Sequence, residues 1–187
     1  MNTEIVTTLI SVGASCVISI IGFIITNISL KKSLKNEMRK SRDNVALEKM
    51  SSMPYEILDF WDEMIEVDKI TNKNQKSSKQ KENLIKFKKI MNVTYSYGSE
   101  SAIKIVALMQ KENYAAVNQE IEQSVYRMAS TLVLLITQIK YDVTEIVVSP
   151  SLWFQMRMND YTEKEKLYQS ANNRLVSELG LNEGFKI

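Results

Sequence analysis

The feature that most constrains this chain is a run of 26 residues, 5–30, that contains no Asp, Glu, Lys or Arg. Sixteen of these residues are apolar. As a helix the run is roughly 39 Å long at ~1.5 Å per residue, which exceeds the ~30 Å hydrocarbon core of a bilayer. The sequence therefore predicts a single transmembrane anchor over residues 1–30. A cleaved signal peptide is the disfavoured alternative, because no basic residue precedes the run and the run is too long for a signal peptide.

The charges on either side of this run predict its orientation. Glu4 is the only charged residue before the run, whereas a basic collar follows it: Lys31, Lys32, Lys35, Arg39, Lys40 and Arg42. Since Lys and Arg mark the cytoplasmic side, we expect a single-pass protein of the cell membrane with its N-terminus outside and the remainder in the cytoplasm. The collar also suits anionic lipid headgroups, so the bilayer is the first expected partner, and nucleic acid is the alternative ligand.

Small and hydroxylated residues recur within the run at helical spacing. They form a stripe along one side: Thr8, Ser11, Ser15, Ser19, Gly22 and Thr26. Such a stripe lets two helix backbones approach closely and lets hydroxyls bond across the contact, which predicts a homo-oligomer. The alternative is that each hydroxyl bonds a preceding carbonyl of its own helix.

No turn signal follows the run until Ser51 and Pro54, so we expect the helix to continue as a charged stalk, ending at about Met50. The predicted parts are then the anchor (1–30), the stalk (31–52) and a cytoplasmic domain (53–187). Helical periodicity without sustained alternation makes the whole chain all-α, and the last part a bundle of about five helices.

Charge alternates sharply after Pro54. Six acids lie on a first helix between residues 56 and 68, and eight lysines against one acid lie between residues 69 and 89. This pattern predicts an antiparallel helical hairpin with complementary charge, in which residues 71–81 form a loop or a frayed helix start. The alternative is a patch for single-stranded nucleic acid, with Phe87, Tyr95 and Tyr97 for stacking and a group of basic side chains: Lys79, Lys81, Lys86, Lys88 and Lys89.

Three of the acids, Asp59, Asp62 and Glu66, share a helix face. Carboxylates in one place suit a hard cation, but no ligand loop or second carboxylate helix accompanies them. A solvated face opposite the apolar side is the simpler interpretation, and no metal site is predicted.

Later segments show further helix signals. Gly98 and Ser99 indicate a helix stop followed by an N-cap. A long helix is expected from about residue 119 to residue 142, and its uncharged stretch 128–139 is too short to span a bilayer, which predicts a central buried helix.

The end of the sequence predicts two shorter helices. Ser149 and Pro150 should begin one that places Trp153 and Phe154 in the core. A capping box at residues 162–165 should begin the last helix, which Gly180 should end.

Composition removes most catalytic chemistry. The chain has no histidine, its single cysteine is Cys16 within the apolar run, and none of its five glycines lies in a phosphate-binding motif. His-dependent nucleophiles, His-ligated zinc and intrachain disulfides are therefore excluded. We predict no catalytic residue, no cofactor and no enzymatic activity.

Short strings carry a family resemblance: Tyr97-Gly98-Ser99, Ile139-Lys140-Tyr141-Asp142 and Ser149-Pro150-Ser151-Leu152-Trp153-Phe154, behind a leading span. With these strings the chain resembles uncharacterised single-pass membrane proteins of low-GC Gram-positive bacteria and their prophages, over residues 95–180. The resemblance implies a phage-defence or mobile-element context and carries no catalytic residue.

The sequence as a whole predicts a membrane-anchored helical interaction or assembly module that recruits an unknown cytoplasmic protein. A membrane-tethered single-stranded nucleic-acid-binding protein that uses residues 69–89 is the alternative.

Overall fold

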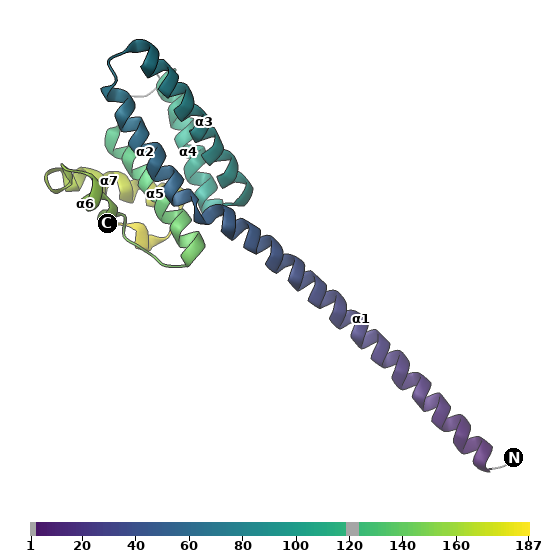
Figure 1. Ribbon diagram of the computed structural model, residues 1–187. Coiled ribbons are helices and arrows are strands. Elements are labelled where there is room, and N and C mark those ends of the chain that lie inside the picture. Colours follow the sequence, from purple (N-terminus) through teal and green to yellow (C-terminus); the bar gives the residue numbers. More distant parts are fainter. Residues whose placement is uncertain (1–2, 119–123) are drawn as a thin grey trace. The chain divides into compact units, whose positions relative to one another are not determined.

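The computed structural model describes the backbone of residues 3–118 and 124–187 and the side chains of residues 23–67, 69–118 and 124–187 (Figure 1). Every regular element in this part of the chain is a helix, which confirms the all-α fold. The chain divides into two compact units, residues 1–45 and 46–187. Each is described by itself.

The first unit is one helix, α1, which runs as Thr3–Ser51 and whose last turns belong to the second unit. Its end at Ser51 confirms the prediction that the helix continues to about Met50. Residues 23–51 contain neither Gly nor Pro, so no residue of this stretch interrupts the helix. Over the described residues, no helix combines the length and apolar character needed to cross a membrane. Residues 5–22 of the predicted span lie outside the described side chains.

Four helices of the second unit form a closed ring: α2 (Met53–Lys69), α3 (Lys73–Tyr97), α4 (Glu100–Val117) and α5 (Val125–Thr144). Each packs against the next in the chain, and α5 returns to pack against α2. Helices α6 (Pro150–Arg157) and α7 (Tyr161–Leu179) and a short 3₁₀ turn (Glu183–Phe185) follow. Both α6 and α7 pack on α5. The described part of this unit holds six α-helices, α2 to α7, where about five were expected.

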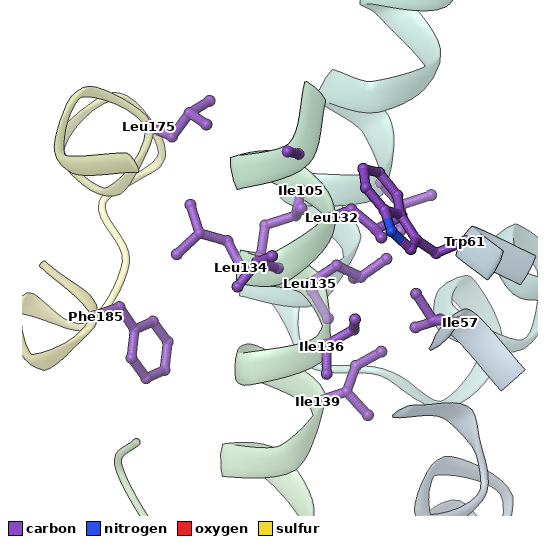
Figure 2. Close-up of a cluster of buried hydrophobic side chains, with 14 of the residues drawn as sticks. Ile57, Trp61, Ile105, Leu132, Leu134, Leu135, Ile136, Ile139, Leu175 and Phe185 are labelled. Atoms are coloured by element: carbon purple, nitrogen blue, oxygen red, sulfur yellow. The ribbon is translucent and has the colours of Figure 1, made fainter. Parts of the chain in front are cut away.

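The ring is closed by a buried central helix, as predicted. Residues 129–139 of α5 are all buried, although the sequence includes polar side chains among them. Figure 2 shows the reason: α5 lies between α7, which presents Leu175, and α2, which presents Ile57 and Trp61. Neighbours on both sides leave no face of α5 for water. The predicted start at about residue 119 is wrong, because Ser124 is extended and α5 begins at Val125; residues 119–123 lie outside the described residues.

The start of α3 was expected as a loop or a frayed helix start. Residues 73–81 are helical, so of the two alternatives expected for 71–81 the helix start is confirmed and the loop is wrong. The side chain of Asn72 caps the helix by accepting hydrogen bonds from the backbone N–H groups of Asn74 (3.0 Å) and Gln75 (3.3 Å). Lys79 in this stretch pairs with Glu63 and Glu82 instead of entering the core. The first turns of α3 can therefore be polar.

Other boundaries follow local capping chemistry. Ser99 caps α4 by accepting from the backbone N–H of Ala102 at 3.2 Å, and Ser149 caps α6 by accepting from that of Ser151 at 3.3 Å, both as predicted. Gly180 ends α7 with φ of 62°, also as predicted. Helix α7 begins at Tyr161, one residue before the predicted capping box at 162–165, and its backbone is kinked at Lys164 within that box (φ −115°, ψ 16°).

The aromatic residues of α6 belong to the core. Phe154 is fully buried and packs on Tyr161 and Tyr168 from α7. Trp153 is half-buried, with its ring edge-on to Trp61 at 6.0 Å between centroids. The interpretation of both residues as core residues is confirmed.

Candidate functional site

The predicted membrane features fall mostly where the structure says little. Five stripe residues, from Thr8 to Gly22, lie outside the described side chains, and the sixth, Thr26, is exposed. All six basic side chains of the collar are exposed. Two of them, Arg39 and Arg42, contact Asp43, at 3.8 and 3.1 Å. The other four make no ion pair among the described residues.

The charged faces of α2 and α3 pair with each other. The order of the pairs runs in opposite directions along the two helices, which confirms the antiparallel hairpin with complementary charge. The contacts are Lys89 Nζ to Glu56 Oε2 (2.8 Å), Lys86 Nζ to Asp59 Oδ2 (3.1 Å), Lys86 Nζ to Glu63 Oε1 (2.5 Å) and Lys79 Nζ to Glu63 Oε1 (3.9 Å).

These acids hold their lysines in the charged form. Hydrogen bonds to Glu63 and then Asp59 raise the pKa of Lys86. A hydrogen bond to Glu82 and the charge of Glu63 raise the pKa of Lys79. The pairing accounts for the helical hairpin without any ligand.

The five lysines of the nucleic-acid alternative are therefore split. Three of them, at positions 79, 86 and 89, contact acids, whereas Lys81 and Lys88 are exposed without an ion pair in the described part of the chain. Phe87, expected as a stacking surface, is buried and packs on Phe60 at 5.7 Å between ring centroids. Tyr95 and Tyr97 remain exposed.

The acidic face of α2 shows no metal-binding arrangement. Asp59 contacts Lys86, and Asp62 forms an ion pair with Arg157 of α6. Within the described residues, no group of three or more His, Cys, Asp or Glu side chains is placed to hold an ion.

The second unit contains a cavity inside its ring of four helices, which we call the bundle cavity. Its volume is about 230 Å³, and side chains of α2, α3, α4 and α5 line it. The walls are mainly rings and thioethers: Phe60, Trp61, Met64, Phe87, Met109 and Met128. Helical bundles commonly place ligand sites in this position, between facing helices.

An adjoining hollow of about 340 Å³ shares Trp61, Met64, Gln80, Asn83 and Met128 with the bundle cavity. Leu84 on the rim is exposed, so the bundle cavity opens to the surface beside α3. Figure 2 shows the Trp61 ring beside Leu132, and both residues line the bundle cavity.

The polar side chains that line the bundle cavity differ in whether they have hydrogen-bond partners. Thr131 donates its hydroxyl to the backbone oxygen of Arg127 at 2.7 Å, and Glu112 Oε1 accepts from Arg127 Nε at 2.6 Å. Asn83 is only 8% exposed, and its amide oxygen is buried without a hydrogen-bond partner in the described structure. A buried amide oxygen without a hydrogen-bond partner costs free energy of folding. Asn83 therefore requires an explanation, whereas Thr131 and Glu112 do not.

Arg127 ties the helices next to the bundle cavity together. It contacts Glu112 of α4 and, at 2.9 Å, Glu178 of α7. Partial burial alone would lower its pKa, but the hydrogen bonds to both glutamates outweigh this and raise the pKa. Glu112 is thereby neutralised within the protein.

Sequence reasoning missed this site. Helical spacing through Leu84, Phe87, Ile90 and Met91 favours Leu84 for the buried side of α3, whereas Leu84 is 53% exposed and Asn83 is buried. The buried residues of α3 are Asn83, Phe87, Ile90 and Thr94, at spacings of four, three and four residues. This helical spacing, with an amide among apolar side chains, was the sequence signal for the site.

No protein-family model, curated protein or solved structure matches this chain. Functional conclusions therefore rest on its own residues.

Proposed function

We propose that this chain is a membrane-anchored interaction module, held in the bilayer by residues 5–30, with its helical bundle on the cytoplasmic side. The observation that carries the proposal is the uncharged run of 26 residues followed at once by six cations. The described part of α1 adds support, because Phe23, Ile25 and Ile28 are 71%, 62% and 63% exposed. Removing such side chains from water stabilises by about 25 cal/mol per Å² of apolar surface buried. Lipid or a second copy of the helix would bury that surface.

The orientation can be tested with single cysteines in a Cys16→Ser background. A cysteine at position 2 and another at position 95 provide matched reporters on the two sides of the predicted span. In intact cells, a membrane-impermeant maleimide should label position 2 and reach position 95 only after lysis. Labelling of position 95 in intact cells would reverse the proposed orientation.

We also propose that the anchor helices self-associate through the stripe of small residues. In the same Cys16→Ser background, cysteines at 11, 15, 22 and 26 should crosslink in native membranes more efficiently than cysteines at 10, 17, 20 and 24, which helical spacing puts on the opposite side. The reason is that residues on one side of a helix share one contact with a partner. Equal crosslinking around the helix would contradict self-association through the stripe.

The partner and setting are part of the same proposal. We infer recruitment of a cytoplasmic protein from the charged stalk and from the lack of a catalytic motif in the sequence, and a phage-defence or mobile-element context from the resemblance of the short strings. The α2 and α3 pairing supports a protein-directed module over the nucleic-acid alternative, because acids already neutralise Lys79, Lys86 and Lys89. This part is tested by using the tagged full chain to capture a partner from detergent-solubilised membranes. Capture should be lost when residues 53–187 are deleted and retained when the small residues of the stripe are replaced.

A further inference from the structure

We propose that the bundle cavity is a binding site for a small, neutral and mainly apolar molecule that carries one hydroxyl group, such as a phenol or a fatty alcohol. The inference does not depend on the membrane anchor, because every lining residue belongs to the second unit.

The walls set the apolar body of the ligand. Phe60, Trp61 and Phe87 are each at least nine-tenths buried, and they hold the hollow open with rigid rings. Met64, Met109 and Met128 complete the walls with flexible thioethers, which adapt to irregular apolar shapes. A cavity of about 150 Å³ already admits benzene, so about 230 Å³ has room for a bicyclic ring or a medium alkyl chain.

Asn83 sets the polar group of the ligand. Its amide lines the bundle cavity and the adjoining hollow, and its oxygen has no partner among the described residues. An amide presents a donor at one end and an acceptor at the other, and a hydroxyl can pair with either end. A hydroxyl is therefore the group that best satisfies Asn83, whichever way the amide is turned.

The charge of the lining sets the neutrality of the ligand. Among the described residues, Glu112 is the only formally charged side chain that lines the bundle cavity, and Arg127 neutralises it at 2.6 Å. Within the described part of the chain, no lysine or arginine lines either hollow to pair with a carboxylate or phosphate. An anionic group placed beside Asn83 inside the cavity would have to shed its water without a counter-charge, which favours a neutral hydroxyl there over a carboxylate or a phosphate.

Water alone fills this space poorly. A buried water needs two to four polar partners, and Asn83 offers one buried, unpaired amide oxygen among rings and thioethers, whereas the Gln80 and Asn113 amides that also line the cavity are exposed. A ligand with an apolar body and a single hydroxyl matches both the walls and the amide.

The test uses the full chain in lipid nanodiscs with ¹³C-methyl methionine, and 1-naphthol as the probe. Three methionines line the bundle cavity, whereas Met156 of α6 is 74% exposed and does not line it. Titration with 1-naphthol should shift the methyl signals of Met64, Met109 and Met128 with saturation and leave Met156 unchanged. No saturable shift at the three lining methyls, as a cavity holding only water would give, overturns the proposal.

The hydroxyl preference is measured by comparing 1-naphthol with 1-methylnaphthalene, which has the same ring and lacks the hydroxyl. The ratio of their two Kd values should favour 1-naphthol roughly tenfold more in the wild type than in Asn83→Leu, because one hydrogen bond is lost. Partition of each probe into lipid cancels in this comparison of ratios. An unchanged ratio overturns the assignment of the hydroxyl to Asn83.

A second pair of variants tests the location even if Asn83→Leu fails to fold. Leu84→Trp should fill the mouth of the bundle cavity and weaken binding of both probes at least tenfold. Leu152→Trp is the matched control, because Leu152 on α6 is 51% exposed against 53% for Leu84 and does not line the cavity. Equal binding by the two tryptophan variants overturns the location.

Discussion

At the scale of single residues, Gly98 is required by a close approach rather than by unusual backbone torsion. A Cβ atom at this position would lie 2.6 Å from the backbone oxygen of Thr94, the acceptor that the Gly98 N–H uses to end α3. Gly98→Ala should therefore lower the free energy of unfolding by about 1–3 kcal/mol, because backbone has to move. Urea unfolding measures this.

Gly180 provides the comparison for Gly98. Its φ is 62°, and a Cβ atom added there would have no neighbour within 4 Å, so its constraint is torsional only. Asparagine tolerates this left-handed conformation, and Gly180→Asn should cost less stability than Gly98→Ala. A Gly98→Ala protein as stable as the wild type would show that the turn relaxes freely.

Tyr168 gives stability a dependence on alkaline pH. It is 1% exposed, and burial, together with the nearby Asp160 charge, raises its pKa from 10.0 to about 12. Between these values the unfolded chain releases a proton that the folded chain retains, so stability should fall as pH rises from about 10 to about 12. Tyr168→Phe should lose less stability over this window, measured by urea unfolding at several pH values.

Tyr95→Phe is the control for this pH effect, because Tyr95 is 77% exposed. Its pH profile should follow that of the wild type. The assignment to Tyr168 is contradicted if Tyr168→Phe and Tyr95→Phe lose stability equally as the pH rises from about 10 to about 12.

At the scale of elements, the pairing of α2 with α3 is fixed by charge on a partly buried face. Glu63 is 19% exposed and contacts Lys86 at 2.5 Å. A double-mutant cycle of Glu63→Gln with Lys86→Met should give a coupling energy near the upper end of the usual range, about 1 kcal/mol, and it should shrink in about 1 M salt.

The matched pair for this cycle is Glu100 with Lys104 on α4. These side chains are 82% and 51% exposed and lie within one helix. Their coupling should be smaller, because water screens both side chains. A coupling for Glu63 with Lys86 no larger than this would remove charge pairing as the determinant of the hairpin.

At the scale of the whole molecule, the second unit contains its own core and includes the last turns of α1. Met50 is 3% exposed in that core, although it belongs to the helix that begins at Thr3. Residues 46–187 should therefore unfold at the same urea concentration as the full chain. A chain that begins at residue 53 should be less stable by about 2–5 kcal/mol, because the Met50 contacts are lost.

Met50→Ala within residues 46–187 separates the packing of this side chain from the effect of a shorter chain. It should reproduce most of the loss. If residues 46–187 unfold at markedly lower urea than the full chain, then the division at residue 45 is not a thermodynamic one.

How much the sequence could predict depends on whether the cause is local. The helix starts at Ser99 and Ser149 and the stop at Gly180 were predictable, because capping uses residues within one turn. The polar stretch 71–81 left a loop and a helix start open, and Asn72, a capping residue before a polar helix, was the local signal for the helix start. The start of α7 was predicted to within one residue, but the kink at Lys164 was not.

The all-α fold, the uncharged run, the central buried helix and the complementary charge of α2 and α3 can all be predicted from the linear chain. Each of these follows from spacing along one helix or from charges on neighbouring helices. The packing of the helices was needed to show that Asn83 rather than Leu84 faces the interior, and that four helices enclose a cavity at that point. Burial of a given side chain depends on how far each helix is rotated against three others, which no local pattern specifies.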